Sequence, residues 1–164
     1  MKAQETLTLI RPSAKSVWKT AHCVLWSRPT RHPKEALGLH GPVDDVVLNI
    51  ETVGDEIKGN EEYTPRPSAV VSWFMNPFSA NELVGKTFQI PKAFDQRVRD
   101  HLVDMVYYEH MDVDDNRVEF IARHGDTFHV RWTGVMEDNS PPKGSPPHPT
   151  IQVVADFSTK MVKR

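Results

Sequence analysis

The chain has 164 residues, a net charge of −2, 38% hydrophobic residues, 13 prolines and one cysteine. This length predicts a single domain, residues 1–164, that buries its core without a disulfide or a structural metal. The lone Cys23 excludes an intrachain disulfide and a zinc site made of several cysteines. No apolar stretch reaches the roughly 18 to 20 residues that cross a bilayer, and the N-terminus lacks the apolar core of a signal peptide, so we expect a soluble, cytoplasmic protein without membrane contact.

Strands are predicted along most of the first half of the chain, because apolar and polar residues alternate with period two or β-branched residues gather. These runs lie at residues 6–9, 17–26, 46–51 and 68–74. We interpret the run 17–26 as one strand, which places Trp18 and Trp26 on the same face and in the core.

A helix is predicted only after Pro91. Phe94, Val98 and Leu102 recur at helical spacing, with charged residues between them. We expect a helix of about two to three turns near residues 92–104 that passes into a strand reaching about Met111.

A β-hairpin is predicted at residues 117–134. Opposed residues must share a face of the sheet, and a two-residue loop at Gly125-Asp126 would set Phe120 against a charged residue. A three-residue loop from His124 to Asp126 gives the pairs Val118–Trp132, Glu119–Arg131 and Phe120–Val130. We therefore predict an odd loop with Gly125 at positive φ.

The last clear alternation covers residues 150–157, after a proline-rich connection at 140–149 that cannot form a sheet ladder. Together the elements predict a mainly β (α+β) fold, in which an antiparallel sheet forms a sandwich or a partly closed barrel with one helix. The sequence leaves sandwich and barrel as open alternatives.

Charge is distributed unevenly near the N-terminus. Residues 1–34 hold seven Lys or Arg against one acid, whereas residues 35–64 hold eight acids against one Lys. Either the two segments neutralise each other, or the acidic segment faces a basic protein partner, as in an inhibitor or immunity protein. For that second case we take Asp44, Asp45, Asp55 and Glu56 as partner-binding residues of a non-catalytic interaction protein.

A second hypothesis places function in the polar segment around residue 110. Tyr107, Glu109, His110 and Asp112 would form an alternative pocket if they converge. Such a pocket suits a small-molecule-binding β barrel or a metal or His–carboxylate enzyme.

A calcium site is not expected in the same segment, although Asp112, Asp114 and Asn116 match the opening of a calcium loop. Arg117 stands where the sharp turn needs Gly, and Arg123 stands where the bidentate Glu must lie. We interpret the segment as a turn between strands.

Catalytic and cofactor motifs are incomplete. The eight histidines show no zinc-site spacing, no GxSxG motif is present, and Gly85-Lys86-Thr87 lacks the first Gly of the GxxxxGK[ST] phosphate loop. We therefore expect no catalytic residue, no metal and no cofactor, with His129 exposed on the hairpin and Cys23 buried and unreactive.

A third hypothesis is binding of single-stranded nucleic acid by Trp18 or Trp26 among Arg28, Arg31 and Lys34. It requires an exposed tryptophan. The mildly acidic chain and the assignment of both tryptophans to the core argue against it.

Overall fold

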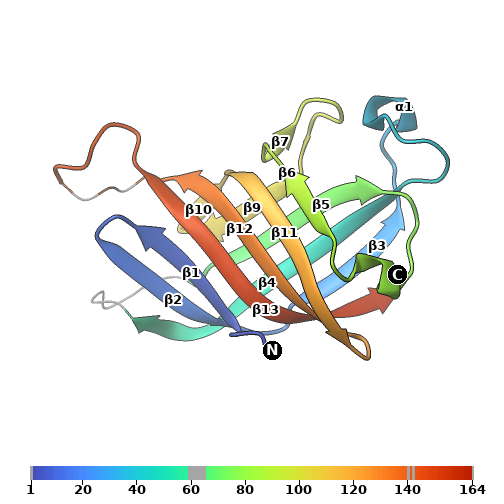
Figure 1. Cartoon of the computed structure of the whole chain (residues 1–164). Helices are drawn as coiled ribbons and strands as arrows, with labels where there is room; N and C mark the ends of the chain where they lie inside the picture. The colour runs from blue at the N-terminus through green and yellow to red at the C-terminus, as the bar shows by residue number, and fades with distance from the viewer. Residues whose placement is uncertain (1, 59–65, 140, 142, 164) are drawn as a thin grey trace.

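Most of the strands that the structure describes form one continuous sheet, whose path closes on itself (Figure 1). The computed structural model describes residues 2–58, 66–139, 141 and 143–163. Within these residues the sheet has eleven strands, and two further short strands, β7 (Phe94–Asp95) and β8 (Asp100–His101), pair only with each other. The predicted mainly β fold is therefore confirmed, with the barrel alternative realised in part of the sheet.

Five strands form the closed part. They are β1 (Thr6–Arg11), β2 (Ala14–Thr20), β3 (Val24–Pro29), β4 (Asp44–Lys58) and β13 (Thr150–Lys163). β13 pairs antiparallel with β1 and parallel with β3, and β3 pairs in turn with β4. Because β3 joins β13 to β4, the ring β1–β2–β4–β3–β13 leaves no free edge within these strands.

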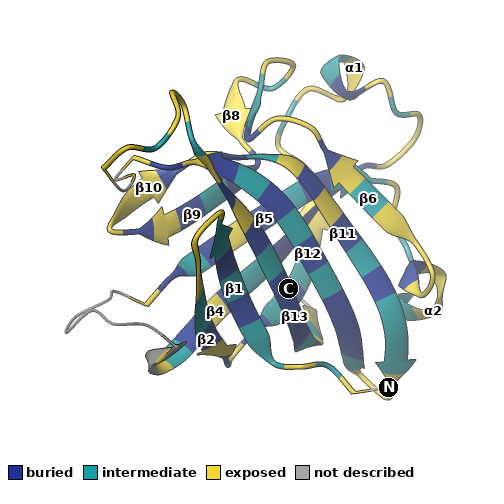
Figure 2. Ribbon diagram, turned by 60° about the vertical axis from the view of Figure 1, so that its left-hand side comes forward, coloured by how far each residue is buried: buried dark blue, intermediate teal, exposed yellow. Residues whose placement is uncertain are grey.

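Two groups of strands extend from this barrel, and we call them the wings. One wing continues from β4 through β5 (Ser68–Met75), β9 (Val103–Tyr107) and β10 (Glu109–Met111). The other continues from β13 through β12 (Thr127–Glu137), β11 (Val113–His124) and β6 (Thr87–Ile90). The wings face each other, so their inward residues share the core with the barrel (Figure 2).

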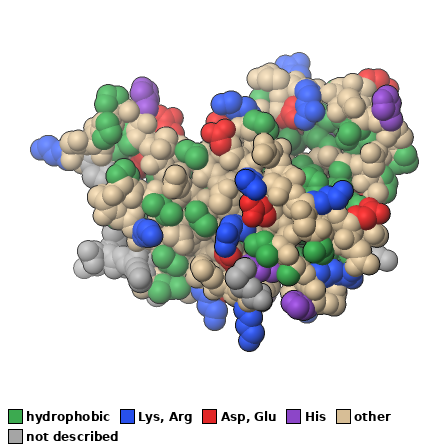
Figure 3. Space-filling view, in the orientation of Figure 1, with side chains coloured by type: hydrophobic (Ala, Val, Ile, Leu, Met, Phe, Trp, Pro, Cys, Tyr) green, Lys and Arg blue, Asp and Glu red, His purple; other side chains and the backbone are tan. Residues whose placement is uncertain are grey.

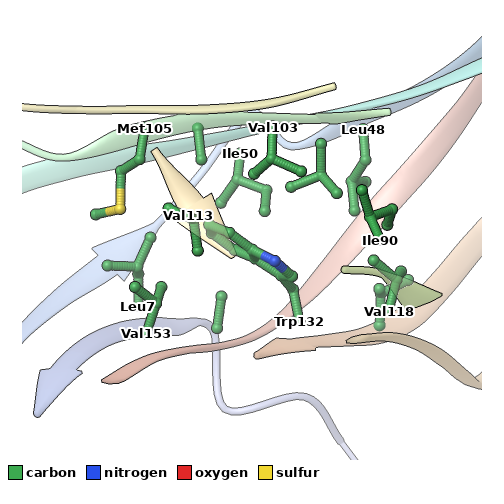
Figure 4. Packing of buried hydrophobic residues seen from close by; sticks show 14 of the residues in the cluster. Leu7, Leu48, Ile50, Ile90, Val103, Met105, Val113, Val118, Trp132 and Val153 are labelled. Atoms are coloured by element: carbon green, nitrogen blue, oxygen red, sulfur yellow. The ribbon is translucent and has the colours of Figure 1, made fainter. Parts of the chain in front are cut away.

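The core is filled by large side chains rather than left hollow. Trp18, Phe120, Phe128, Trp132 and Phe157 are almost completely buried. Trp132 lies between the two facing parts of the sheet, among aliphatic side chains from both (Figure 4). Its indole N–H donates a hydrogen bond of 2.9 Å to the Oδ1 atom of Asn116, which satisfies a donor that would be costly to bury alone.

The predicted strands are confirmed at four places, because residues 6–9, 46–51, 68–74 and 150–157 lie in β1, β4, β5 and β13. The single strand predicted at 17–26 is wrong. The chain breaks at residues 21–23, where His22 has a left-handed φ of 58°, and β2 and β3 belong to different places in the sheet. As a result Trp18 is in the core, whereas Trp26 is half-buried on the outer face of β3.

The helix predicted near residues 92–104 is also wrong. Asp95 Oδ1 accepts a hydrogen bond from the backbone N–H of Arg97 at 2.8 Å, and Arg99 has a φ of 55°, so the chain turns back to pair β7 with β8. An aspartate that binds the backbone two residues on competes with helix formation.

Among the described residues the helices are instead α1 (Lys34–Leu37) and α2 (Ala80–Leu83), each of one turn. α2 begins with a capping box between Ser79 and Glu82, a signal visible in the sequence. In the described part of the chain, no helix is long and apolar enough to cross a membrane.

The hairpin of β11 and β12 has the predicted register but not the predicted loop. Phe120 pairs with Val130, Val118 with Trp132 and Glu119 with Arg131, and Gly125 has a φ of 64°. His124 pairs with Thr127, which leaves a two-residue turn, and a bulge between Phe120 and Ala122 supplies the extra residue. A bulge and an odd loop shift the register by the same one residue, so the side-chain pattern cannot separate them.

Candidate functional site

A cavity of about 510 Å³ lies where the ends of β5 and β6 approach the segment 91–97 and the residues that follow α1. We call it the wing cavity, because it lies at the open end between the two wings. In the space-filling view, hydrophobic side chains line a hollow beside α1 (Figure 3). Its size falls within the range of about 300–1,000 Å³ that is typical of small-molecule sites.

The apolar wall of the wing cavity is built on β5 and α1. Trp73 is an inward residue of β5 and stacks on Phe88, with ring centroids 4.9 Å apart. Phe74 points to the outer face, so the cavity extends around the end of the strand. Leu37 ends α1 and is buried, because Gly38 at a φ of 64° turns the chain back over the cavity.

Trp73 also carries a buried polar atom close to this wall. Its side chain is 5% exposed, and its Nε1 atom has no hydrogen-bond partner among the described residues. Buried indole N–H groups usually have a partner, and an unsatisfied buried donor costs about 1–3 kcal/mol.

The rim of the wing cavity is polar and holds more cations than anions. Among its lining residues are Lys92, Arg97 and Asp95. The Arg97 guanidinium donates to Asp95 through both Nε and Nη2, the latter at 2.6 Å, and this hydrogen bonding lowers the pKa of the Asp95 carboxyl. Lys92 is mostly exposed, with its Nζ atom 3.5 Å from Asp114. The rim therefore tolerates a polar or anionic group on a ligand whose body lies against the apolar wall.

The four acidic residues predicted to bind a partner do not form one surface. Asp45 is buried and pairs with Arg28, and Asp44 is half-buried beside it at the start of β4. Asp55 and Glu56 lie near the other end of the same strand, on the order of 30 Å away at the rise of an extended chain. The side chains of Asp55 and Glu56 lie outside the described part of the structure.

The alternative pocket of Tyr107, Glu109, His110 and Asp112 is divided among separate contacts. His110 Nδ1 lies 2.7 Å from Asp104, and Asp112 lies 3.3 Å from Nε2 of His101, both on exposed surface. Tyr107 and Glu109 line a small cleft of about 50 Å³, in which Glu109 accepts a hydrogen bond from the side-chain amide of Asn139. The four side chains therefore do not converge on one reacting centre.

The segment that imitates a calcium loop is a structural bulge. Asp114 Oδ1 accepts a hydrogen bond of 2.8 Å from the backbone N–H of Ala93. The buried Asn116 donates to the carbonyls of Ile90 and Val113, at 3.0 and 2.6 Å. These hydrogen bonds attach the segment before β7 to β11, so Asp114 and Asn116 stabilise the fold.

His129 was expected to be exposed, and the structure shows it 6% exposed. Its Nε2 atom lies 2.8 Å from Asp156, whose carboxylate also accepts hydrogen bonds from Arg131 and from the backbone N–H of Gln4. Burial tends to raise the pKa of Asp156, but these three donors outweigh it and hold the pKa below its ordinary value. The N-terminal segment covers this pair, a contact between residues 152 positions apart that strand patterning does not predict.

The wing cavity does not follow from the sequence pattern, because the helical spacing at residues 92–104 predicts a helix there. The residues of the rim come from the turn that replaces this helix, and Asp95-Gln96-Arg97 was the signal for that turn. In the parts of the chain that the structure describes, no three His, Cys, Asp or Glu side chains gather closely enough to hold a metal ion.

Comparison with protein-family models, curated proteins and solved structures finds no match for this chain.

Proposed function

We propose that this chain binds a small, mainly apolar molecule with a hydrogen-bond acceptor in the wing cavity and does not convert it chemically. The observation that carries the proposal is an apolar-walled cavity of about 510 Å³, lined by Trp73 and Leu37, with the polar groups of Lys92 and Arg97 at its rim. Apolar walls with a few placed polar groups are typical of small-molecule sites.

Several features support a ligand of this class. Trp73 and Phe88 present a stacked aromatic surface that suits a planar or aliphatic body. Lys92 and Arg97 at the rim suit a carbonyl or carboxylate. His110 and Asp112 make separate contacts on exposed surface and neither lines the wing cavity, so they supply it with no acid–base group.

A fluorescent probe tests the proposal directly. Prodan is a neutral naphthalene dye with one ketone oxygen, and its emission responds to polarity and to hydrogen bonding at that oxygen. We expect it to bind the folded protein with saturable, blue-shifted emission. Leu39→Trp fills the wing cavity from the loop after α1 and should abolish binding, whereas Val106→Trp, on the exposed face of β9, is the matched control.

Trp73→Phe tests the role of the indole N–H, because it keeps an aromatic wall and removes the donor. Loss of one hydrogen bond of about 1 kcal/mol weakens prodan binding by about fivefold. Equal prodan affinity in the wild type, Leu39→Trp and Val106→Trp would exclude the wing cavity as the site.

The protein-partner hypothesis stays a prediction in a narrower form. Because Asp45 is buried and paired with Arg28, a basic partner would not contact all four of the predicted acidic residues at once. Binding of single strands through Trp18 would need an exposed ring, and Trp18 is in the core. The same hypothesis through Trp26, which is half-buried on the outer face beside Arg28, stays a prediction.

A further inference from the structure

A second hollow, of about 220 Å³, lies on the outer face of β3, β4 and β5, and we call it the outer groove. Two rows of paired residues cross these strands. One row is Trp26, Val47 and Ser72, and the other is Arg28, Asp45 and Phe74. His32 and the segment 100–102 complete the walls. The outer groove thus combines aromatic rings, an apolar floor and charged side chains.

Asp45 is the unusual residue of the outer groove. It is 7% exposed, and its Oδ2 atom accepts one long hydrogen bond, 3.3 Å from Nε of Arg28. Its Oδ1 atom is also buried and has no hydrogen-bond partner among the residues that the structure describes. A carboxylate can accept about four hydrogen bonds, and burying one without enough donors is costly. The Asp45 carboxylate therefore has fewer hydrogen-bond donors than it can accept from, and a cationic donor would suit it.

Arg28 provides only one long hydrogen bond to the Asp45 carboxylate. Its side chain is 47% exposed, and its guanidinium carbon lies 5.2 Å from the centroid of the Trp26 ring. An exposed arginine that makes one long bond can leave its position without opening the core. The arrangement of carboxylate, aromatic ring and displaceable cation is the chemistry that recognises organic cations.

The charge around the outer groove also favours a cation. The lining residues include two carboxylates, Asp45 and Asp100, against one guanidinium, Arg28. A metal ion needs several ligands together, and no group of three His, Cys, Asp or Glu meets that need within the described ranges. The floor of Val47 and the ring of Trp26 suit an apolar body rather than a hydrated ion.

We propose that the outer groove binds a small organic amine, whose ammonium group displaces the Arg28 guanidinium and binds the Asp45 carboxylate beside Trp26. The amine carries an apolar body that lies over Val47 and Val70. This site is separate from the proposed function of the wing cavity, although Trp73, Phe74 and Leu102 contribute to the walls of both.

Titration calorimetry of the full chain with phenethylamine and with phenylethyl alcohol tests the proposal. The two probes have the same apolar body, but only the amine is cationic at neutral pH. We expect the amine to bind at least about tenfold more tightly than the alcohol, because a buried charged hydrogen bond contributes more than a neutral one. Equal binding of the two probes, or binding of neither, would overturn the proposal.

Two substitutions should act in opposite directions. Asp45→Asn should remove the preference for the amine, whereas Arg28→Gln should strengthen amine binding several-fold by removing the resident cation. Glu119→Gln, which removes a carboxylate from β11 away from the outer groove, is the matched control and should change nothing. Arg28→Gln binding the amine more weakly than the wild type would contradict the displacement.

Val70→Trp covers the groove from an exposed position on β5 and should abolish binding of both probes. It keeps the test decisive if Asp45→Asn does not fold, a point checked by thermal unfolding. Phenethylamine should not displace prodan, and Asp45→Asn should retain prodan binding. Failure of the outer groove is thereby distinguished from failure of the wing cavity.

Discussion

Asn116→Ala should be the most informative change to the stability of this protein. Asn116 is 2% exposed and connects three elements through its side chain. It donates to the carbonyls of Ile90 in β6 and Val113 in β11, and it accepts from the indole N–H of Trp132 in β12. Alanine removes all three hydrogen bonds and leaves each of these partners without its bond to Asn116.

The magnitude follows from what is left behind. A buried hydrogen bond contributes about 1 kcal/mol, and an orphaned buried donor costs about 1–3 kcal/mol. The two carbonyls each keep a second lone pair for other donors, so Trp132 dominates the loss. We expect Asn116→Ala to lower the free energy of unfolding by about 3–5 kcal/mol.

Urea unfolding followed by tryptophan fluorescence measures this loss. Asn76→Ala is the matched control, because Asn76 also donates to two carbonyls, those of His40 and Pro42, at 2.7 and 2.8 Å, but on exposed surface. Water replaces these bonds, so the control should lose less than about 1 kcal/mol. A double-mutant cycle with Trp132→Phe should give a coupling energy of about 1–2 kcal/mol.

Equal destabilisation by Asn116→Ala and Asn76→Ala would refute the reasoning, since it would mean that burial adds nothing to the cost. An absence of coupling between Asn116 and Trp132 would separately refute the assignment of the loss to the indole N–H.

Three further predictions use the same structure. Gly134→Ala should destabilise the protein by about 1–3 kcal/mol in the same urea assay, because a Cβ there would overlap the Val113 side chain and lie 2.8 Å from the Asn116 side chain. Asp156→Asn should flatten the acid limb of stability against pH: the pKa of Asp156 is lowered in the folded state, so its contribution is complete above about pH 4 and is lost as the pH falls through the folded value. A limb of unchanged slope would count against that contribution. Cys23 should react slowly with a disulfide reagent at about pH 8 and rapidly after unfolding, because burial raises the pKa of its thiol to about 11.

The sequence by itself determined the local elements whose pattern repeats within a few residues. Alternation at 46–51 and 150–157 predicted strands that lie in β4 and β13, and the pairing of Phe120 with Val130 followed from the need for apolar residues to share a face. These inferences succeeded because period-two burial depends only on neighbouring residues and on the existence of a core.

The helix predicted near residues 92–104 and the single strand predicted at 17–26 were wrong because other local interactions compete with these elements. The spacing of Phe94, Val98 and Leu102 fits a helix, but the hydrogen bond from the Arg97 N–H to Asp95 and the pairing of β7 with β8 satisfy the backbone instead. The break at His22 similarly divides an apolar run that patterning treats as continuous.

Only the tertiary structure decided how the barrel closes and where its hollows lie. The parallel pairing of β3 with β13 joins residues more than 130 positions apart, and it is this pairing that separates a barrel from a sandwich. The wing cavity and the outer groove each collect side chains from distant strands and turns, and the burial of Asp45 and His129 depends on segments that cover them. A residue's charge and hydropathy are written in the sequence, but its exposure depends on which distant segment packs against it, and that is fixed only when the whole sheet has closed.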